Sequence, residues 1–311
     1  MTAFNGLIQE HFDTYSREKW ASMVHNLARM KTKDVMLSLS SLAEKGLETE
    51  LDGLERSASD EIPNITNQKK VDAQWVYWFR GNEQRENLKS FLEKTPLNQN
   101  NIFNIAPQDK HATLALIIRN DALWIGLALP CGAVVDRGNL AAKLEKSWER
   151  EKFHDLLSEL PEGAMTGFDQ NLVPTGSQSM EALAEQSTSL KDDQLRWSLG
   201  IHISTSDSIE LGADLADLVH RWVGALLPIY RFVAWTREND FIEVNKKIQE
   251  EKAQKRHQAK SFSKGDKVRV TAGLFSGEVG TIQSIDTKGK AKVQVGKMSV
   301  VVPAEELIPA K

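Results

Sequence analysis

Apolar residues recur every three or four positions through much of the first 240 residues, which is the spacing of one face of a helix. Pro228 lies inside the last such stretch, and because proline lacks an amide proton, we expect it to kink or split that helix. Helices are expected over residues 4–50, 83–94, 139–160, 180–190 and 211–235.

Elsewhere in this region, stretches that are dense in aromatic or apolar residues, or that alternate between apolar and polar residues as in residues 194–204, predict strands. Strands are expected over residues 72–80, 112–119, 123–129, 165–169 and 194–204. Asn120 and Asp121 are turn-forming residues between two of them and predict a hairpin. Arg196, Ser198 and His202 occupy the polar side of the last stretch, which predicts a half-buried strand.

These elements predict three regions in the chain. Residues 1–240 are expected to form an α+β domain in which helices pack on an antiparallel or mixed sheet. Residues 241–260 carry opposite charges four positions apart, which favours an exposed, charged helical linker. Residues 261–311 contain short alternating stretches punctuated by glycine, which predicts a small, closed β-barrel.

The charge is distributed unevenly among these regions, although the whole chain carries only −4. Residues 1–245 hold 25 basic and 36 acidic side chains, a net charge of −11. Residues 246–260 carry +4 and residues 261–311 carry +3. A basic carboxy-terminal region suggests a polyanionic or acidic partner, although the same charges would also keep a linker solvated.

Aromatic residues are concentrated on the predicted strands of the first domain. They are Trp75, Tyr77, Trp78, Phe79, Trp124 and Trp197. Aromatic side chains on paired strands usually form core, which is the simplest interpretation here. They could also line a pocket or a surface on which bases stack, and the sequence leaves this alternative open.

Motifs of catalysis, metal binding and nucleotide binding are missing from the sequence. It has no HExxH, GxSxG or GxGxxG motif and no P-loop. The single cysteine, Cys131, excludes an intramolecular disulfide and a cysteine-rich zinc site, and no obvious basic neighbour would activate it. We therefore expect no catalytic residue, metal or cofactor, and an enzymatic body is left open but not favoured.

Targeting and membrane segments are not expected either. The amino terminus lacks the basic and apolar regions of a signal peptide. The longest apolar stretches, such as residues 124–135, are too short to span a bilayer. These features predict a cytoplasmic protein.

The most informative stretch is residues 264–282, KGDKVRVTAGLFSGEVGTI. Val268 and Val270 alternate with Lys267 and Arg269, so one side of this strand is expected in a core and the other to be basic and exposed. Glycine suits turns that need a positive φ and places where two backbones pass closely. The glycines expected in these roles are Gly265, Gly273, Gly277 and Gly280.

This stretch resembles the KOW motif of NusG-type transcription elongation factors and of the ribosomal proteins L24 and L26. The matching positions are Gly265, Asp266, Val268, Val270, Gly273, Phe275, Gly277, Gly280 and Ile282. Residues 292–302 are also similar to the NusG-type barrel, and the resemblance does not extend before residue 260. It implies an SH3-like barrel that attaches to RNA, to ribosomal or transcription partners, or to other protein elements.

If the barrel binds nucleic acid, basic side chains would neutralise phosphates and an aromatic ring would stack on a base. The candidates are Lys264, Lys267, Arg269, Phe275, Lys288, Lys290, Lys292 and Lys297. Alternatively, the basic residues are solvated outward positions of strands and Phe275 caps the barrel core.

We therefore expect a two-domain, non-catalytic binding protein whose barrel attaches to RNA or to the transcription or translation machinery. One alternative is a protein-interaction adaptor that does not bind nucleic acid. Another is an enzymatic or ligand-binding body that the barrel tethers. The sequence does not predict the oligomeric state or a role for residues 1–240.

Overall fold

The computed structural model describes residues 4–65, 67–92, 106–192, 194–244, 246, 262–286 and 290–310. The chain forms two compact units, Met1–Ile242 and Glu243–Lys311. Each unit has its own sheet and its own apolar core. The helical linker predicted over residues 241–260 falls almost entirely outside the described residues.

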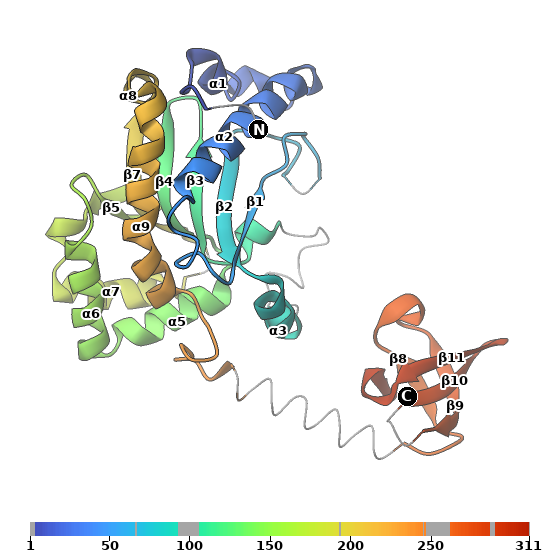
Figure 1. The fold of residues 1–311 in the computed structure, drawn as a ribbon. Coiled ribbons are helices and arrows are strands. Elements are labelled where there is room, and N and C mark those ends of the chain that lie inside the picture. The colour runs from blue at the N-terminus through green and yellow to red at the C-terminus, as the bar shows by residue number, and fades with distance from the viewer. Residues whose placement is uncertain are drawn as a thin grey trace. The chain divides into compact units, whose positions relative to one another are not determined.

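The first unit, here called the body, is built on a seven-stranded sheet (Figure 1). The strand order is β1-β2-β3-β4-β7-β5-β6, and every neighbouring pair is antiparallel. The predicted hairpin is present, since β3 pairs with β4 through the turn at Asn120 and Asp121. The strands are β1 (Leu54–Ala58), β2 (Gln74–Arg80), β3 (Thr113–Ile118), β4 (Ala122–Leu129), β5 (Met165–Phe168), β6 (Asn171–Pro174) and β7 (Trp197–Ser204).

The helices of the body lie mostly in a layer on one face of this sheet. They are α1 (Gln9–Asp13), α2 (Asn26–Ala43), α3 (Asn82–Leu92), α5 (Val134–Leu144), α6 (Ser147–Ser158), α7 (Met180–Ser189), α8 (Thr205–Glu210) and α9 (Leu215–Val233). The exception is α3, which places Arg85 over the Phe79 ring of the other face. The long helices α2 and α9 pack against each other and cover the central strands (Figure 1). Helices α5, α6 and α7 contact one another, and α5 and α6 also contact α9, which extends the layer.

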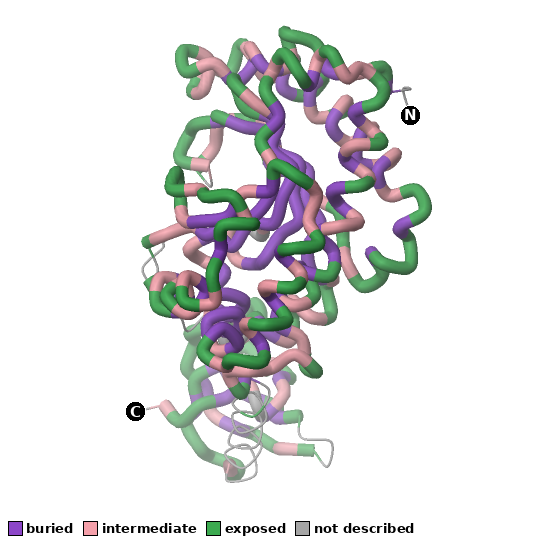
Figure 2. Tube along the Cα trace, turned by 90° about the vertical axis from the view of Figure 1, so that its left-hand side faces the viewer, coloured by how far each residue is buried: buried purple, intermediate pink, exposed green. Residues whose placement is uncertain are grey.

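The main core lies between this helical layer and the sheet. Trp78, Leu116, Ile125 and Leu199 come from four neighbouring strands and share one apolar cluster with Leu226 of α9. Figure 2 shows the buried positions concentrated along the central strands. Burying each such side chain contributes about 1.5–3 kcal/mol, so the helical layer and the sheet stabilise each other.

The opposite face of the sheet carries a second, smaller apolar cluster. Its aromatic members are Tyr77, Phe79 and Trp124, with the half-buried Trp75 packed against them. Trp78 and Trp197 instead belong to the main core. Because successive strand residues point to opposite sides, the aromatic group is divided between the two faces of the sheet.

The helix predicted over residues 139–160 is two helices in the structure. Helix α5 ends at Leu144, and α6 begins at Ser147. Lys146, between them, has an extended backbone with φ −97° and ψ 124°. The Arg150 guanidinium donates a hydrogen bond to the Leu144 carbonyl (2.6 Å), which satisfies a carbonyl group at the end of α5.

Of the kink or split expected at Pro228, the split does not occur, because α9 runs from Leu215 to Val233 with Pro228 inside it. An internal proline costs a helix about 3 kcal/mol. The neighbouring Leu226, Leu227 and Ile229 are all buried, and their packing holds the helical path.

A buried ion pair joins several elements of the body. Arg80 at the end of β2 pairs with Asp136 of α5, and both side chains are about 1% exposed. The Asp136 carboxylate also accepts the backbone N–H groups of Ala112 and Trp235, each at 2.8 Å. Because the carboxylate is ion-paired and hydrogen-bonded, the cost of desolvating its charge is compensated. The same bonds hold the start of β3 and the segment after α9 against α5.

The second unit, here called the barrel, contains a five-stranded antiparallel sheet in the order β11-β10-β9-β8-β12. The strands are β8 (Lys267–Val270), β9 (Val279–Ile285), β10 (Lys290–Val295), β11 (Met298–Pro303) and β12 (Leu307–Pro309). Valine, isoleucine, alanine and leucine side chains from all five strands form its core. The predicted α+β body and small carboxy-terminal barrel are thereby confirmed.

Candidate nucleic-acid interface

Strand alternation places the basic residues of the barrel on its outside. In β8, Val268 and Val270 are buried, whereas Lys267 and Arg269 are exposed. Strand β10 repeats the pattern, with Lys290 and Lys292 exposed on either side of the buried Ala291. The apolar side chains pack into the core. Because successive side chains of a strand point to opposite sides, the cations between them face solvent.

The pairing register shows how these cations are distributed. Strands β8 and β10 lie on either side of β9, where Lys267 pairs with Thr281 and Lys292 pairs with Ser284. Across the sheet, the two lysines are separated by two strand spacings, about 10 Å. Along the strand direction, they are separated by three residues of β9, which is also about 10 Å. The cations are spread over one outer surface rather than gathered at one point.

Lys264 extends this surface, whereas Lys297 lies apart from it. The Gly265 amide donates to the Ile282 carbonyl (2.8 Å), which brings Lys264 alongside β9. Ile282 pairs on its other side with Val293, so Lys264 and β10 flank the same stretch of β9. Lys297 is exposed in the turn between β10 and β11, and Lys288 falls outside the described residues.

The described cations of the barrel form no ion pair with any residue that the structure describes. All six are exposed, and they are Lys264, Lys267, Arg269, Lys290, Lys292 and Lys297. Their charge is therefore available to a polyanion, and phosphate contacts by such side chains give affinity that falls as salt rises.

The loop between β8 and β9 contains a short 3-10 turn over Gly273–Phe275. Its base is fixed because the Gly277 amide donates to the Val270 carbonyl (2.8 Å). Phe275, the predicted stacking residue, is half-buried and packs against the barrel core. Leu274 beside it is fully exposed, at 101%.

The motif glycines have two different roles. Gly265, Gly273 and Gly277 have φ between 76° and 98°, a region that side chains disfavour. Gly280 is instead needed for packing, because a Cβ there would lie 2.5 Å from the Val293 side chain and 2.6 Å from the Gln294 carbonyl oxygen.

Exposed apolar residues are part of the same surface, and the sequence did not single them out. Ile308, Arg269 and Val279 stand in one row across β12, β8 and β9, and the two apolar members are 41% and 43% exposed. Val301 on β11 is 63% exposed. The clearest sequence indication was Leu274, an apolar residue inside a glycine-rich turn. The outer surface therefore offers apolar as well as charged contacts.

The described part of the body has no candidate metal cluster and no activated thiol. The described residues contain no group of three or more histidine, cysteine or acidic side chains that could hold a metal. Burial raises the pKa of the Cys131 thiol, which disfavours the nucleophilic thiolate. Across the ranges that the structure covers, no helix combines the length and apolarity needed to cross a membrane.

Comparison with protein families gives a match on the barrel. No curated protein matches the chain. The KOW motif model matches residues 264–295, which span β8, β9 and β10 and the glycine loop described above. The resemblance in these residues is therefore confirmed, and the carboxy-terminal region of the chain contains a KOW motif.

Proposed function

We propose that the barrel attaches this protein to RNA, and that the protein acts as a non-catalytic binding module of the transcription or translation machinery. A KOW motif suggests, at most, binding to RNA or to a ribosome-associated surface. The observation that supports RNA is the set of six exposed cations that pair with no described residue, five of them around β8, β9 and β10. The proposal includes no covalent reaction.

Fluorescence anisotropy of labelled single-stranded RNA with the full chain, over a series of salt concentrations, tests this function. Each phosphate contact contributes about 0.7 to the slope of log affinity against log salt, so six cations allow a slope of roughly −4. Lys267→Ala and Lys292→Ala should each reduce the slope by about 0.7.

The matched control is Lys31→Ala, because Lys31 is an exposed lysine of α2 in the body. It should leave both the affinity and the slope unchanged. Absence of RNA binding by the full chain at low salt would exclude the nucleic-acid function.

A second candidate function is that of a protein-interaction adaptor. It is favoured by the full exposure of Leu274 and by the row that contains Ile308 and Val279. Leu274→Ser should then abolish co-sedimentation with ribosomes or a transcription complex without changing affinity for free RNA. Equal loss of both activities would instead assign Leu274 to the RNA contact.

A further inference from the structure

The face of the body's sheet opposite the main core has two paired glycines near its centre. Gly126 of β4 pairs with Gly200 of β7 there. A Cβ at Gly126 would lie 2.3 Å from the Trp124 ring, and one at Gly200 would lie 2.2 Å from the Ile125 carbonyl oxygen. Gly126 therefore leaves room for the Trp124 indole beside it, and Gly200 lets the backbones of β4 and β7 lie close together.

Two neighbouring cavities of about 320 and 340 Å³ lie on this face. They share Trp75, Arg119 and Arg196, and these three residues define what we call the arginine–tryptophan groove. The first cavity is lined largely by polar side chains, and the second has Trp124 in its lining. Each volume is within the range of small-molecule sites, near its lower end.

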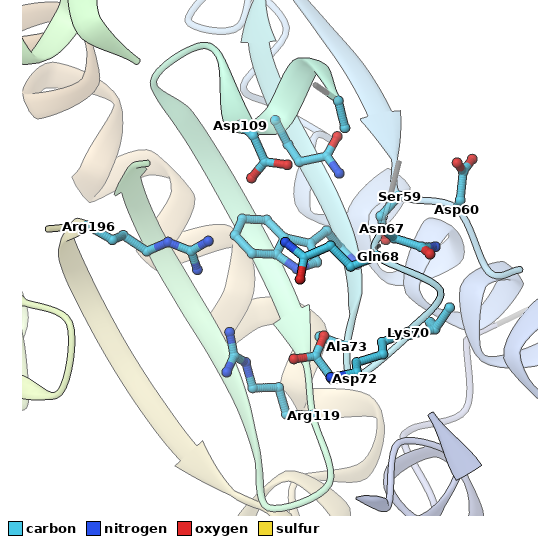
Figure 3. Close-up of a pocket in the computed structure, with 14 residues that line it drawn as sticks. Ser59, Asp60, Asn67, Gln68, Lys70, Asp72, Ala73, Asp109, Arg119 and Arg196 are labelled. Carbon is cyan, nitrogen blue, oxygen red and sulfur yellow. Dashed lines mark hydrogen bonds between the residues drawn. The ribbon is translucent and has the colours of Figure 1, made fainter. Parts of the chain in front are cut away.

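The arginines of the groove are positioned to bind an anion. Figure 3 shows Arg119 and Arg196 reaching into the first cavity from one side, with Asn67 and Gln68 on the other. The Arg196 guanidinium carbon lies 5.3 Å from the centre of the Trp75 ring. Neither guanidinium forms a hydrogen bond or ion pair with any residue in the described ranges, so two forked donors remain available beside an aromatic ring.

Apart from Lys70, a third cation in the lining of the first cavity, the other polar groups of the groove are mostly carboxylates and amides. Asp72 and Asp109 line the first cavity with Gln68, and Asp121 and Asp169 line the second. Burial raises the pKa of Asp109 despite the nearby Arg196. A nucleic-acid strand would bring successive phosphates against these acids, whereas a single phosphate needs only the two arginines.

We propose that the arginine–tryptophan groove binds a nucleoside monophosphate. The base stacks on Trp75, the phosphate lies between Arg119 and Arg196, and the amides and carboxyls pair with the polar groups of the base and the ribose. This site belongs to the body alone and does not rest on RNA binding by the barrel.

Isothermal titration calorimetry of the full chain with AMP, GMP, CMP and UMP tests the proposal. At least one should bind with saturation, and Arg119→Ala and Arg196→Ala should each weaken it about 10- to 100-fold. Trp75→Leu should weaken it about tenfold through loss of stacking. Arg221→Ala, which removes an exposed arginine of α9, is the matched control and should bind as the unchanged protein does.

The barrel variant Lys267→Ala/Lys292→Ala separates this site from the proposed RNA function. It should keep full nucleotide affinity, whatever happens to RNA binding. The proposal would be overturned if no nucleotide bound up to about 5 mM. It would equally be overturned if inorganic phosphate bound as tightly as the nucleotide, or if only oligonucleotides bound and lost affinity in Arg119→Ala.

Discussion

Individual residues of the groove illustrate what a sequence can and cannot predict. The alternation in the last body strand correctly places Arg196, Ser198 and His202 on its polar side, because the pleat alone decides that. Arg119 follows β3 and Arg196 precedes β7, and the two line one cavity only because β4 lies between those strands. The strand order depends on packing of the whole sheet, so this juxtaposition could not be predicted from local pattern.

A single buried histidine should make the stability of the body depend on pH. His111 is 5% exposed, and burial, reinforced by the charge of Arg80, lowers its pKa to about 3. The native state therefore keeps this imidazole neutral, whereas the unfolded chain binds a proton below about pH 6.5. Stability is fully present above that pH and is lost as the pH falls toward 3.

The expected loss from His111 is roughly 1.5 kcal/mol of unfolding free energy between pH 6.5 and pH 5. Urea unfolding of the full chain at several pH values measures it, with the transition of the body followed by tryptophan fluorescence. His111→Gln removes the titrating group and should flatten the dependence in this interval. An unchanged pH dependence in His111→Gln would contradict the assignment.

Among the elements, those with a continuous apolar face were predicted and the edge strands were not. Strands β1 and β6 lie at the two edges of the body's sheet. Their residues are mostly exposed or half-exposed, so they show no alternation of apolar side chains. They are held by backbone hydrogen bonds to the neighbouring strand. Such bonds do not depend on side-chain identity, so the sequence does not indicate them.

The sheet of the barrel should be sensitive to a single added methyl group. Gly280→Ala places a Cβ against β10, 2.5 Å from Val293, and overpacking of this kind typically costs about 1–3 kcal/mol. Amide hydrogens of β8 to β11 in the full chain should therefore exchange faster, by the factor that this loss of unfolding free energy implies. Ser284→Ala, an exposed position on the same strand, is the control and should exchange as the unchanged protein does. Equal exchange rates in both variants would show that β9 and β10 accommodate the added methyl group without loss of stability, which would contradict the prediction.

At the scale of the whole molecule, the uneven charge separates two explanations of RNA binding. The chain carries −4 overall, but residues 1–245 carry −11 and residues 261–311 carry +3. If net charge alone governed association, a chain of −4 would be repelled by RNA in every orientation. Local phosphate contacts instead require only that the cations of the barrel face the RNA, since fields from exposed charges fade over about 10 Å at moderate salt.

Charge reversal at matched places distinguishes these explanations. Lys267→Glu/Lys292→Glu changes the net charge from −4 to −8 and that of residues 261–311 from +3 to −1. Lys31→Glu/Lys45→Glu gives the same −8 but alters only exposed positions of the body. RNA titrations at moderate salt should show binding abolished in the barrel variant and nearly unchanged in the body variant. Equal weakening in both would mean that the overall charge governs association, and the surface of β8 and β10 would lose its role as the RNA contact.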